Sequence, residues 1–280
     1  MTPGVAAAAP VLVVPAPVPV AVPGLDEINW QQPWLEPLRE RGQTLAQQAR
    51  QFGLVEALNR AVERAPVDLS AGRLRFVAQS TLPAGEGYEA FIARSASVPT
   101  RDNLHDLFNG LMWLTQPALK RRLNELQAQQ LALDPMAEPG PGRRGVVRDT
   151  LTLFDENAAC WQAPPVLVDA LRRRDWQALF GRHRDAWAQA RLTLFGHALI
   201  EKLVRPRKPI TAHVWVIPPG VDAQAFLLDT LTAERLATRQ HLALPVLGVP
   251  GWWADNEAAD FYIDSAVFRA PREGPGAASR

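Results

Sequence analysis

The feature that most constrains the fold is an apolar segment with helical periodicity between residues 104 and 114. Five side chains follow the i, i+3, i+4, i+7, i+8 spacing of one helical face: Leu104, Leu107, Phe108, Leu111 and Met112. His105 and Asn109 lie one turn apart on a neighbouring flank of the same predicted helix. The segment therefore predicts a buried helix that carries polar side chains along one edge.

Helical spacing recurs through most of the chain, and it predicts a mainly α fold (α+β with minor short strands) in a single globular helical domain over residues 29–270. Further helices are expected through Leu192–Leu203 and Ala225–Arg239. The alternation in Arg73–Gln79 is typical of a strand. Residues 146–157 fit either period, and the helical pattern is favoured.

Both ends of the chain have the composition of disordered tails. Residues 1–28 are rich in Ala and Pro, and the prolines interrupt every apolar run before it reaches the length of a membrane span. No basic residue precedes this run, which argues against a secretory signal. Residues 271–280 are expected to form a disordered C-terminal tail, and Asp134–Gly145 a mobile surface loop rich in Pro and Gly.

Composition excludes one broad class of function. The 280 residues are 47% hydrophobic and 21% charged, which is enough for a sizeable core, and the formal net charge is only +1. A general nucleic-acid binder would need a strong basic excess, so the short basic runs are interpreted mainly as solvated helix faces. The single cysteine, Cys160, cannot form an internal disulfide, and a reducing, cytoplasmic location is expected.

Polar side chains cluster in three separated segments. The first surrounds the predicted helix at 104–114 and contains Arg101, Asn103, His105, Asp106, Asn109 and, further on, Lys120. The second contains Arg148, Asp149, Asp155, Glu156 and Asn157. The third contains His197 and Glu201, which are four residues apart and share a helical face. We predict that the three segments meet in one polar cleft.

These motifs carry a family resemblance. They are Pro99-x-Arg-Asp-Asn-x-His-Asp-x-x-Asn109 with Trp113 and Lys120, Arg148-Asp149 with Leu153-Phe154-Asp155-Glu156-Asn157, Phe195-Gly196-His197-Ala198-Leu199-x-Glu201, Gly248-Val249-Pro250-Gly251, and Phe261-Tyr262 with Phe268-Arg269. In this order they resemble the bacterial family known as domain of unknown function 3025, over roughly Trp30 to Arg269. The resemblance implies no established activity.

The chemistry of the three segments suggests a metal-assisted hydrolase that acts on a small anionic or phosphate-containing molecule. In this hypothesis His105, His197 and Asp155 or Glu156 bind a divalent metal, because imidazole with carboxylate suits Zn, Mn or Fe. Glu201 or Asp106 would accept the proton of a metal-bound water. Arg148 or Lys120 would hold the anionic group of the substrate. Arg101, Asn103, Asn109, Asp149 and Asn157 would complete the polar cluster.

A second class of function is kept beside this one. The same side chains could form a buried hydrogen-bond network that locks helices together in a non-catalytic binding or structural protein. The sequence lacks the motifs of three common enzyme classes: His-Glu-x-x-His of zincins, Gly-x-Ser-x-Gly of serine hydrolases and Gly-x-x-x-x-Gly-Lys of P-loop proteins. No motif therefore supports these three kinds of chemistry. The aromatic residues after Pro245 either pack the C-terminal segment onto the core or form one wall of a pocket.

Overall fold

A computed structural model describes residues 21–133 and 145–270 of the chain. The predicted loop Asp134–Gly145, except its last residue, and most of the predicted tails lie outside these ranges. The α-helices are α1 (Arg39–Phe52), α2 (Leu54–Arg64), α3 (Tyr88–Ser95), α4 (Leu104–Thr115), α5 (Pro117–Leu133), α6 (Val146–Asn157), α7 (Pro165–Arg173), α8 (His197–Lys202), α9 (Ala223–Thr230) and α10 (Ala233–Ala237). Shorter helical turns are η1 (Leu25–Glu27), η2 (Pro33–Leu38), η3 (Gln79–Thr81), η4 (Ala178–Arg182), η5 (Arg184–Gln189), η6 (Val246–Gly248), η7 (Ala254–Glu257) and η8 (Ala259–Ile263).

The strands form three sheets within the described residues. They are β1 (Asp68–Leu69), β2 (Gly72–Arg73), β3 (Arg75–Ala78), β4 (Ser97–Thr100), β5 (Ala158–Gln162), β6 (Arg191–Leu194), β7 (Thr211–Ile217) and β8 (Leu242–Pro245). The largest sheet has the order β6-β5-β7-β8, in which β5 and β7 are parallel and both outer pairings are antiparallel. β3 and β4 pair in parallel, and β1 and β2 form a small hairpin.

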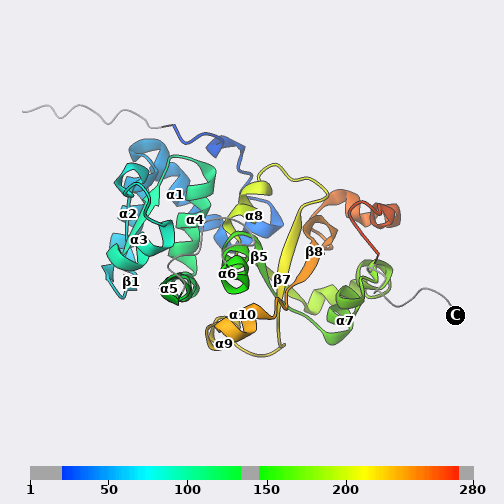
Figure 1. The fold of residues 1–280 in the computed structure, drawn as a ribbon. Coiled ribbons are helices and arrows are strands. Elements are labelled where there is room, and N and C mark those ends of the chain that lie inside the picture. Colours follow the sequence, from blue (N-terminus) through cyan, green and yellow to red (C-terminus); the bar gives the residue numbers. More distant parts are fainter. Residues whose placement is uncertain (1–20, 134–144, 271–280) are drawn as a thin grey trace, which may run out of the picture.

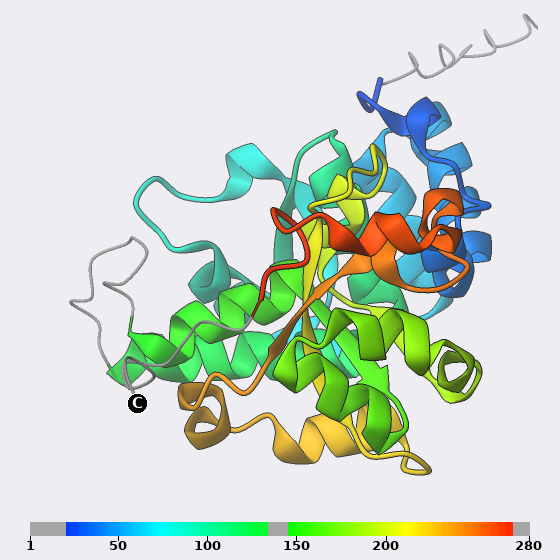
Figure 2. The ribbon, with the colours of Figure 1, turned by 90° about the vertical axis from the view of Figure 1, so that its right-hand side faces the viewer.

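Helices α1 to α5 gather on one side of the molecule and the four-stranded sheet lies on the other, with α6 and α8 between them (Figure 1). Helix α4 packs against α8, and α6 contacts α5, α8 and α10. The second view shows α7, α9 and α10 around the end of the sheet away from α1 (Figure 2). One continuous cluster of buried apolar side chains joins the two sides. Two helices from the middle of the sequence are therefore held between a helical layer and a sheet.

The structure confirms several predicted elements. Helix α4 buries the apolar face predicted from Leu104–Met112, and residues 146–157 form a helix. Strand β3 falls inside the predicted strand at 73–79. The aromatic residues of the C-terminal segment, Phe261, Tyr262 and Phe268, are buried, and Tyr262 stacks on Phe180 with centroids 4.8 Å apart. They therefore pack this segment onto the core.

Other predictions need correction. The strands are not minor, because β5 to β8 form a complete layer of the core. Strand β6 occupies residues 191–194, so the helix expected through Leu192–Leu203 begins only at His197. The helix expected at 225–239 is two helices, α9 and α10. Strands β5, β6 and β8 are only four or five residues long, too short for their period to be separated from that of a helix.

The folded part also begins before the predicted boundary at residue 29. Val22, Leu25 and Ile28 are each less than 8% exposed and belong to the core cluster. Their apolar side chains are spaced three apart, which suits the 3₁₀ turn at Leu25–Glu27. The alanine- and proline-rich composition of the preceding residues concealed this short amphipathic stretch.

Candidate functional site

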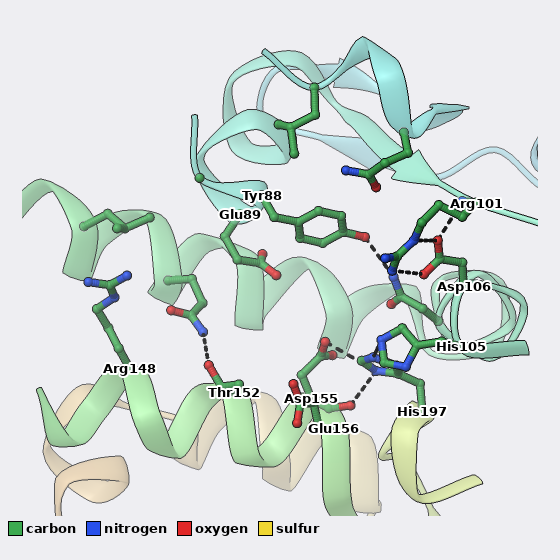
Figure 3. Close-up of a pocket in the computed structure, with 16 residues that line it drawn as sticks. Tyr88, Glu89, Arg101, His105, Asp106, Arg148, Thr152, Asp155, Glu156 and His197 are labelled. Atoms are coloured by element: carbon green, nitrogen blue, oxygen red, sulfur yellow. Dashed lines mark hydrogen bonds and ion pairs between the residues drawn. The ribbon is translucent and has the colours of Figure 1, made fainter. Parts of the chain in front are cut away.

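The two histidines singled out by the sequence meet in the structure. His105 is in the first turn of α4, His197 is the first residue of α8, and their Nε2 atoms are 3.1 Å apart. The rings are edge-to-face, with centroids 4.5 Å apart. Figure 3 shows both rings side by side at one end of a pocket. We call these two residues the pocket histidine pair.

Each ring of this pair has an oxygen acceptor at Nδ1. Glu201 Oε2 is 2.9 Å from His105 Nδ1, and the backbone oxygen of Asp155 is 2.8 Å from His197 Nδ1. An acceptor at Nδ1 holds the ring proton on that nitrogen, so the neutral form of each ring has its lone pair on Nε2. The two lone pairs then face each other, and this contact is favourable only with a proton or another cation between them.

His197 is poorly placed to supply that proton. Its side chain is 6% exposed, and burial lowers its pKa to about 4, although the neighbouring Asp155 carboxylate partly opposes the shift. The side chain of His105 is 35% exposed and that of Glu201 38%. His197 is therefore neutral near neutral pH, and its Nε2 can accept a proton or bind a cation.

A buried lysine fixes the carboxylate beside the pair. Lys120 Nζ donates to Asp155 Oδ1 at 2.6 Å and to Asn109 Oδ1 at 2.8 Å. Burial opposes ionisation of Asp155, but the charges of Lys120 and His197 together hold its pKa below the ordinary value. The Lys120 ammonium also lies 5.2 Å from the centre of a Trp113 ring. Asp155 is consequently an ionised group with a fixed partner.

The start of α4 is held by a second ion pair. Asn103 is the N-cap and accepts from the backbone N–H of Asp106, which accounts for its place in the sequence motif. Arg101 donates through Nε and Nη2 to the two oxygens of Asp106, both at 3.0 Å. The Asp106 side chain is 6% exposed and is matched by this guanidinium. Asp106 is thus occupied in positioning α4.

The pocket beside the histidine pair has a volume of about 510 Å³. Its walls come from α3, α4, α5, α6 and α8 and from two short connecting segments. The lining residues are Gln79, Leu82, Gly87, Tyr88, Glu89, Arg101, His105, Asp106, Asn109, Gln127, Leu131, Arg148, Thr152, Asp155, Glu156 and His197. The pocket thus collects residues from all three predicted motif segments.

Arg148 and Glu156 mark two positions along α6 in this pocket. Arg148, Thr152 and Asp155 project from the same side of the helix in Figure 3, and Arg148 is at the end away from the histidines. Nε and Nη1 of Arg148 are buried and make no hydrogen bond to any residue that the structure describes. Within the described residues the Glu156 side chain likewise has no hydrogen-bond partner. Among the described residues, Arg148 and Glu156 are thus the charged pocket side chains that could still bind a ligand.

Other predicted residues lie outside the pocket lining. Asp149 faces the segment that follows α10, where Arg239 Nη2 is 3.9 Å from its carboxylate. Asn157 accepts from the exposed Lys202 at 3.0 Å. Lys120 is buried, donates to Asp155 and Asn109, and is not among the residues that line the pocket, so it does not face an anionic substrate there in the way proposed from the sequence. Glu201 reaches across to His105 and orients that ring.

Two ionisable wall residues were not predicted from the sequence. The hydroxyl of Tyr88 accepts from Asn109 Nδ2 at 2.9 Å, and its pKa is raised well above the ordinary value, mainly by burial. Glu89 accepts from Asn124 at 2.6 Å, and burial raises its pKa. Both belong to a short helix whose sequence resembles an ordinary turn followed by an apolar stretch. Only the packing of α3 on α5 brings them to the pocket.

A glycine sets the spacing between α6 and α8. A Cβ atom at Gly196 would lie 2.5 Å from the backbone nitrogen of Asn157 and in comparable conflict with the Glu156 carbonyl. The missing side chain lets the residue before His197 touch the end of α6. That contact places His197 Nδ1 within hydrogen-bond distance of the Asp155 carbonyl.

The expected three-ligand metal site does not form among the described residues. No group of three or more His, Cys, Asp or Glu side chains in residues 21–133 and 145–270 has the geometry to hold a metal. Asp155 lies beside the pair, but its Oδ2 is 3.5 Å from His197 Nδ1, on the ring edge opposite the shared Nε2 contact. The two Nε2 atoms remain as the pair of nitrogen donors that converge.

Comparison with known proteins identifies a family and nothing closer. No curated protein and no solved structure matches the chain. In the part of the chain that the structure describes, no helix is both long and apolar enough to cross a membrane. The model of one family, described as a protein of unknown function (DUF3025), matches residues 74–272 and so includes every residue of the pocket wall. The chain belongs to this family.

Proposed function

We propose that the pocket is a metal-assisted hydrolytic site, in which the Nε2 atoms of His105 and His197 bind a divalent cation such as Zn, Mn or Fe. The main support is their 3.1 Å separation. Two nitrogen ligands that are each about 2.1 Å from one metal ion lie roughly 3 Å apart. The acceptors at both Nδ1 atoms are the outer partners that metal-binding histidines require.

Two histidines leave coordination positions open for water and substrate, as hydrolytic metal sites require. In the proposed reaction, the oxygen of a water molecule bonds to the carbonyl carbon or phosphorus of a small anionic substrate, and the bond to the leaving group breaks. Glu156 accepts the proton from water and returns it to the leaving group. We assign this role to Glu156 because Asp106 and Asp155 already have cationic partners and Glu201 holds His105.

A specific observation favours a second candidate function. One proton between the two Nε2 atoms would satisfy the same contact without any metal, and Lys120, Asn109 and Asp155 already satisfy one another. The cluster would then be a closed polar network in a non-catalytic binding or structural protein. The two candidates differ in what the histidine pair holds, which can be measured directly.

The test is a metal titration of tag-free protein after treatment with a chelator. We expect one Zn²⁺ or Mn²⁺ ion per chain in the wild type, and more than about a 100-fold loss of affinity in His105→Ala and in His197→Ala, because each substitution removes one of two protein ligands. His213→Ala is the matched control, since it removes an imidazole from another histidine contact. Circular dichroism verifies that the variants fold.

Two results would overturn the metal site. One is a folded wild-type protein that binds neither ion. The other is an affinity that is unchanged in both pocket variants. Either result would favour the closed network.

A further inference from the structure

The guanidinium of Arg148 is the least satisfied charge in the pocket. Its Nε and Nη1 atoms are excluded from water and make no hydrogen bond within the described structure. A buried charged donor without a partner costs considerable free energy, so such a group usually has a ligand that the free protein lacks. Arginine presents a planar set of donors that matches the oxygens of a carboxylate or phosphate.

The other charges of the pocket do not neutralise Arg148. Asp106 is matched by Arg101 and Asp155 by Lys120. Burial raises the pKa of Glu89, which favours its neutral form, and this carboxyl already accepts from Asn124. Within the described residues, no carboxylate lies in ion-pair contact with Arg148. In the described part of the chain, the unpaired carboxylate of Glu156 is eight residues further along α6, a rise of about 12 Å, so an anion from outside the protein would meet an unpaired positive charge at Arg148.

The position of Arg148 also defines a distance. It precedes Asp155 by seven residues on α6, and Asp155 binds His197 through its backbone oxygen. Seven residues of α-helix rise about 10 Å. Figure 3 shows Thr152 between these two positions, on the same side of the helix. The guanidinium and the histidine pair thus lie at opposite ends of one elongated pocket.

From these observations we infer that Arg148 binds the carboxylate or phosphate group of an elongated substrate, and that this group lies about 10 Å from the bond that reacts at the histidine pair. The inference rests on the proposed function for the location of the reacting bond. It makes Arg148 a specificity-determining residue, and it excludes compact substrates that cannot reach both ends. The hydroxyl of Tyr88 can donate to the middle of such a molecule, because it accepts from Asn109 and keeps its own proton.

The experiment measures binding of two probes by calorimetry, first to metal-free protein and then to protein supplied with Zn²⁺. Octanoate carries one carboxylate and tests the Arg148 end alone. Octanedioate carries a carboxylate at each end, at a separation close to that between Arg148 and the histidines. We expect Arg148→Gln to weaken octanoate binding by about 10- to 100-fold, as expected from the loss of charge-assisted hydrogen bonds. Arg148→Lys should be intermediate, because it keeps the charge and loses the planar donor pair.

Arg121→Gln is the matched control, since Arg121 is a half-exposed arginine on α5 that pairs with Glu125. In the wild type, Zn²⁺ should strengthen octanedioate binding and leave octanoate binding unchanged. Succinate, which is too short to span the pocket, should gain nothing from Zn²⁺.

The outcomes separate this inference from the proposed function. Equal octanoate affinity in the wild type and Arg148→Gln would overturn the anion site, even if the histidines bind metal. Loss of octanoate binding in Arg148→Gln without any effect of Zn²⁺ on octanedioate would keep the anion site and remove the link to a metal-dependent reaction. Equal affinity for succinate and octanedioate in the presence of Zn²⁺ would overturn the proposed length.

Discussion

The protein contains a second histidine contact, His213 with His241, that resembles the pocket histidine pair in ring geometry alone. The ring centroids are 4.8 Å apart with an interplanar angle of 79°, compared with 4.5 Å and 76° for the pocket pair. In the second pair both Nδ1 atoms are buried and have no hydrogen-bond partner. In the pocket pair both Nδ1 atoms face an oxygen, and the Nε2 atoms point at each other.

The difference lies in the surrounding elements. His213 is on β7 and His241 lies just before β8, and the nearest charged groups affecting their pKa values are Lys202 and Arg239. The pocket pair is supplied with a carboxylate from α8 and a free carbonyl from the last turn of α6. Adjacent imidazoles become a candidate site only when other groups fix their tautomers and directions.

The largest expected effect is on stability, when Lys120, the buried cation beside the pocket histidine pair, is removed. Lys120→Met leaves the Asp155 carboxylate buried without its partner, so we expect the free energy of unfolding to fall by about 3–5 kcal/mol. Urea denaturation measures this change. Lys202→Met is the control, because Lys202 is exposed and donates only to Asn157. Equal stability losses in the two variants would show that Asp155 does not depend on the buried lysine.

A smaller effect should follow when the pocket pair loses one of its acceptors. Glu201→Gln removes the negative charge at His105 Nδ1, and we expect metal affinity to fall by about 10- to 100-fold with little change in stability. Competition with a coloured chelator gives the affinity. An unchanged metal affinity would mean that Glu201 does not orient the His105 ring. The acceptors at Nδ1 would then not explain the difference between the pocket histidine pair and the His213–His241 pair.

The smallest effect concerns the second pair and pH. Burial, with the charges of His241 and Lys202, lowers the pKa of His213 from 6.5 to about 4. Between these values the unfolded chain binds a proton that the folded chain does not, so stability is fully present above pH 6.5 and falls as the pH drops toward 4. Partial exposure of His213 keeps the effect modest, because water screens the charge.

His213→Gln removes this titration. Urea denaturation at pH 7 and pH 5 should therefore show a smaller loss of stability in the variant than in the wild type. Identical losses in the two proteins would show that His213 titrates normally in the folded state.

The sequence predicted the elements that carry strong helical periods and missed those that depend on packing. The spacing of Leu107, Phe108 and Leu111 is sufficient to predict α4 and to place His105 on its flank. Strands β5 and β8 carry too few residues for their period to be recognised, and their pairing with β7 brings together residues 28 or more positions apart. The predicted fold class was therefore right about the helices, but it underestimated the strands of the sheet.

The candidate site shows the same division. Sequence motifs singled out His105, His197 and Asp155, and the structure brings these three together. The pairing within the group was not predictable, because it depends on rotamers and on neighbouring elements. Lys120 was assigned to an anionic substrate and is instead bound to Asp155, and Glu201 was assigned to water and instead faces His105. A helical spacing gives the direction of a side chain, whereas its partner is chosen by tertiary packing.

The close approach at Gly196 has a consequence for the whole pocket. Main-chain atoms at the end of α6 contact the backbone of Gly196, just before α8. The absence of a side chain at position 196 therefore sets the distance between α6 and His197. A single added methyl group would push the start of α8 away from the end of α6 and disturb the hydrogen bond between His197 and the Asp155 carbonyl, although every polar side chain would still be present. The proposed cation site thus depends on a residue that has no functional group of its own.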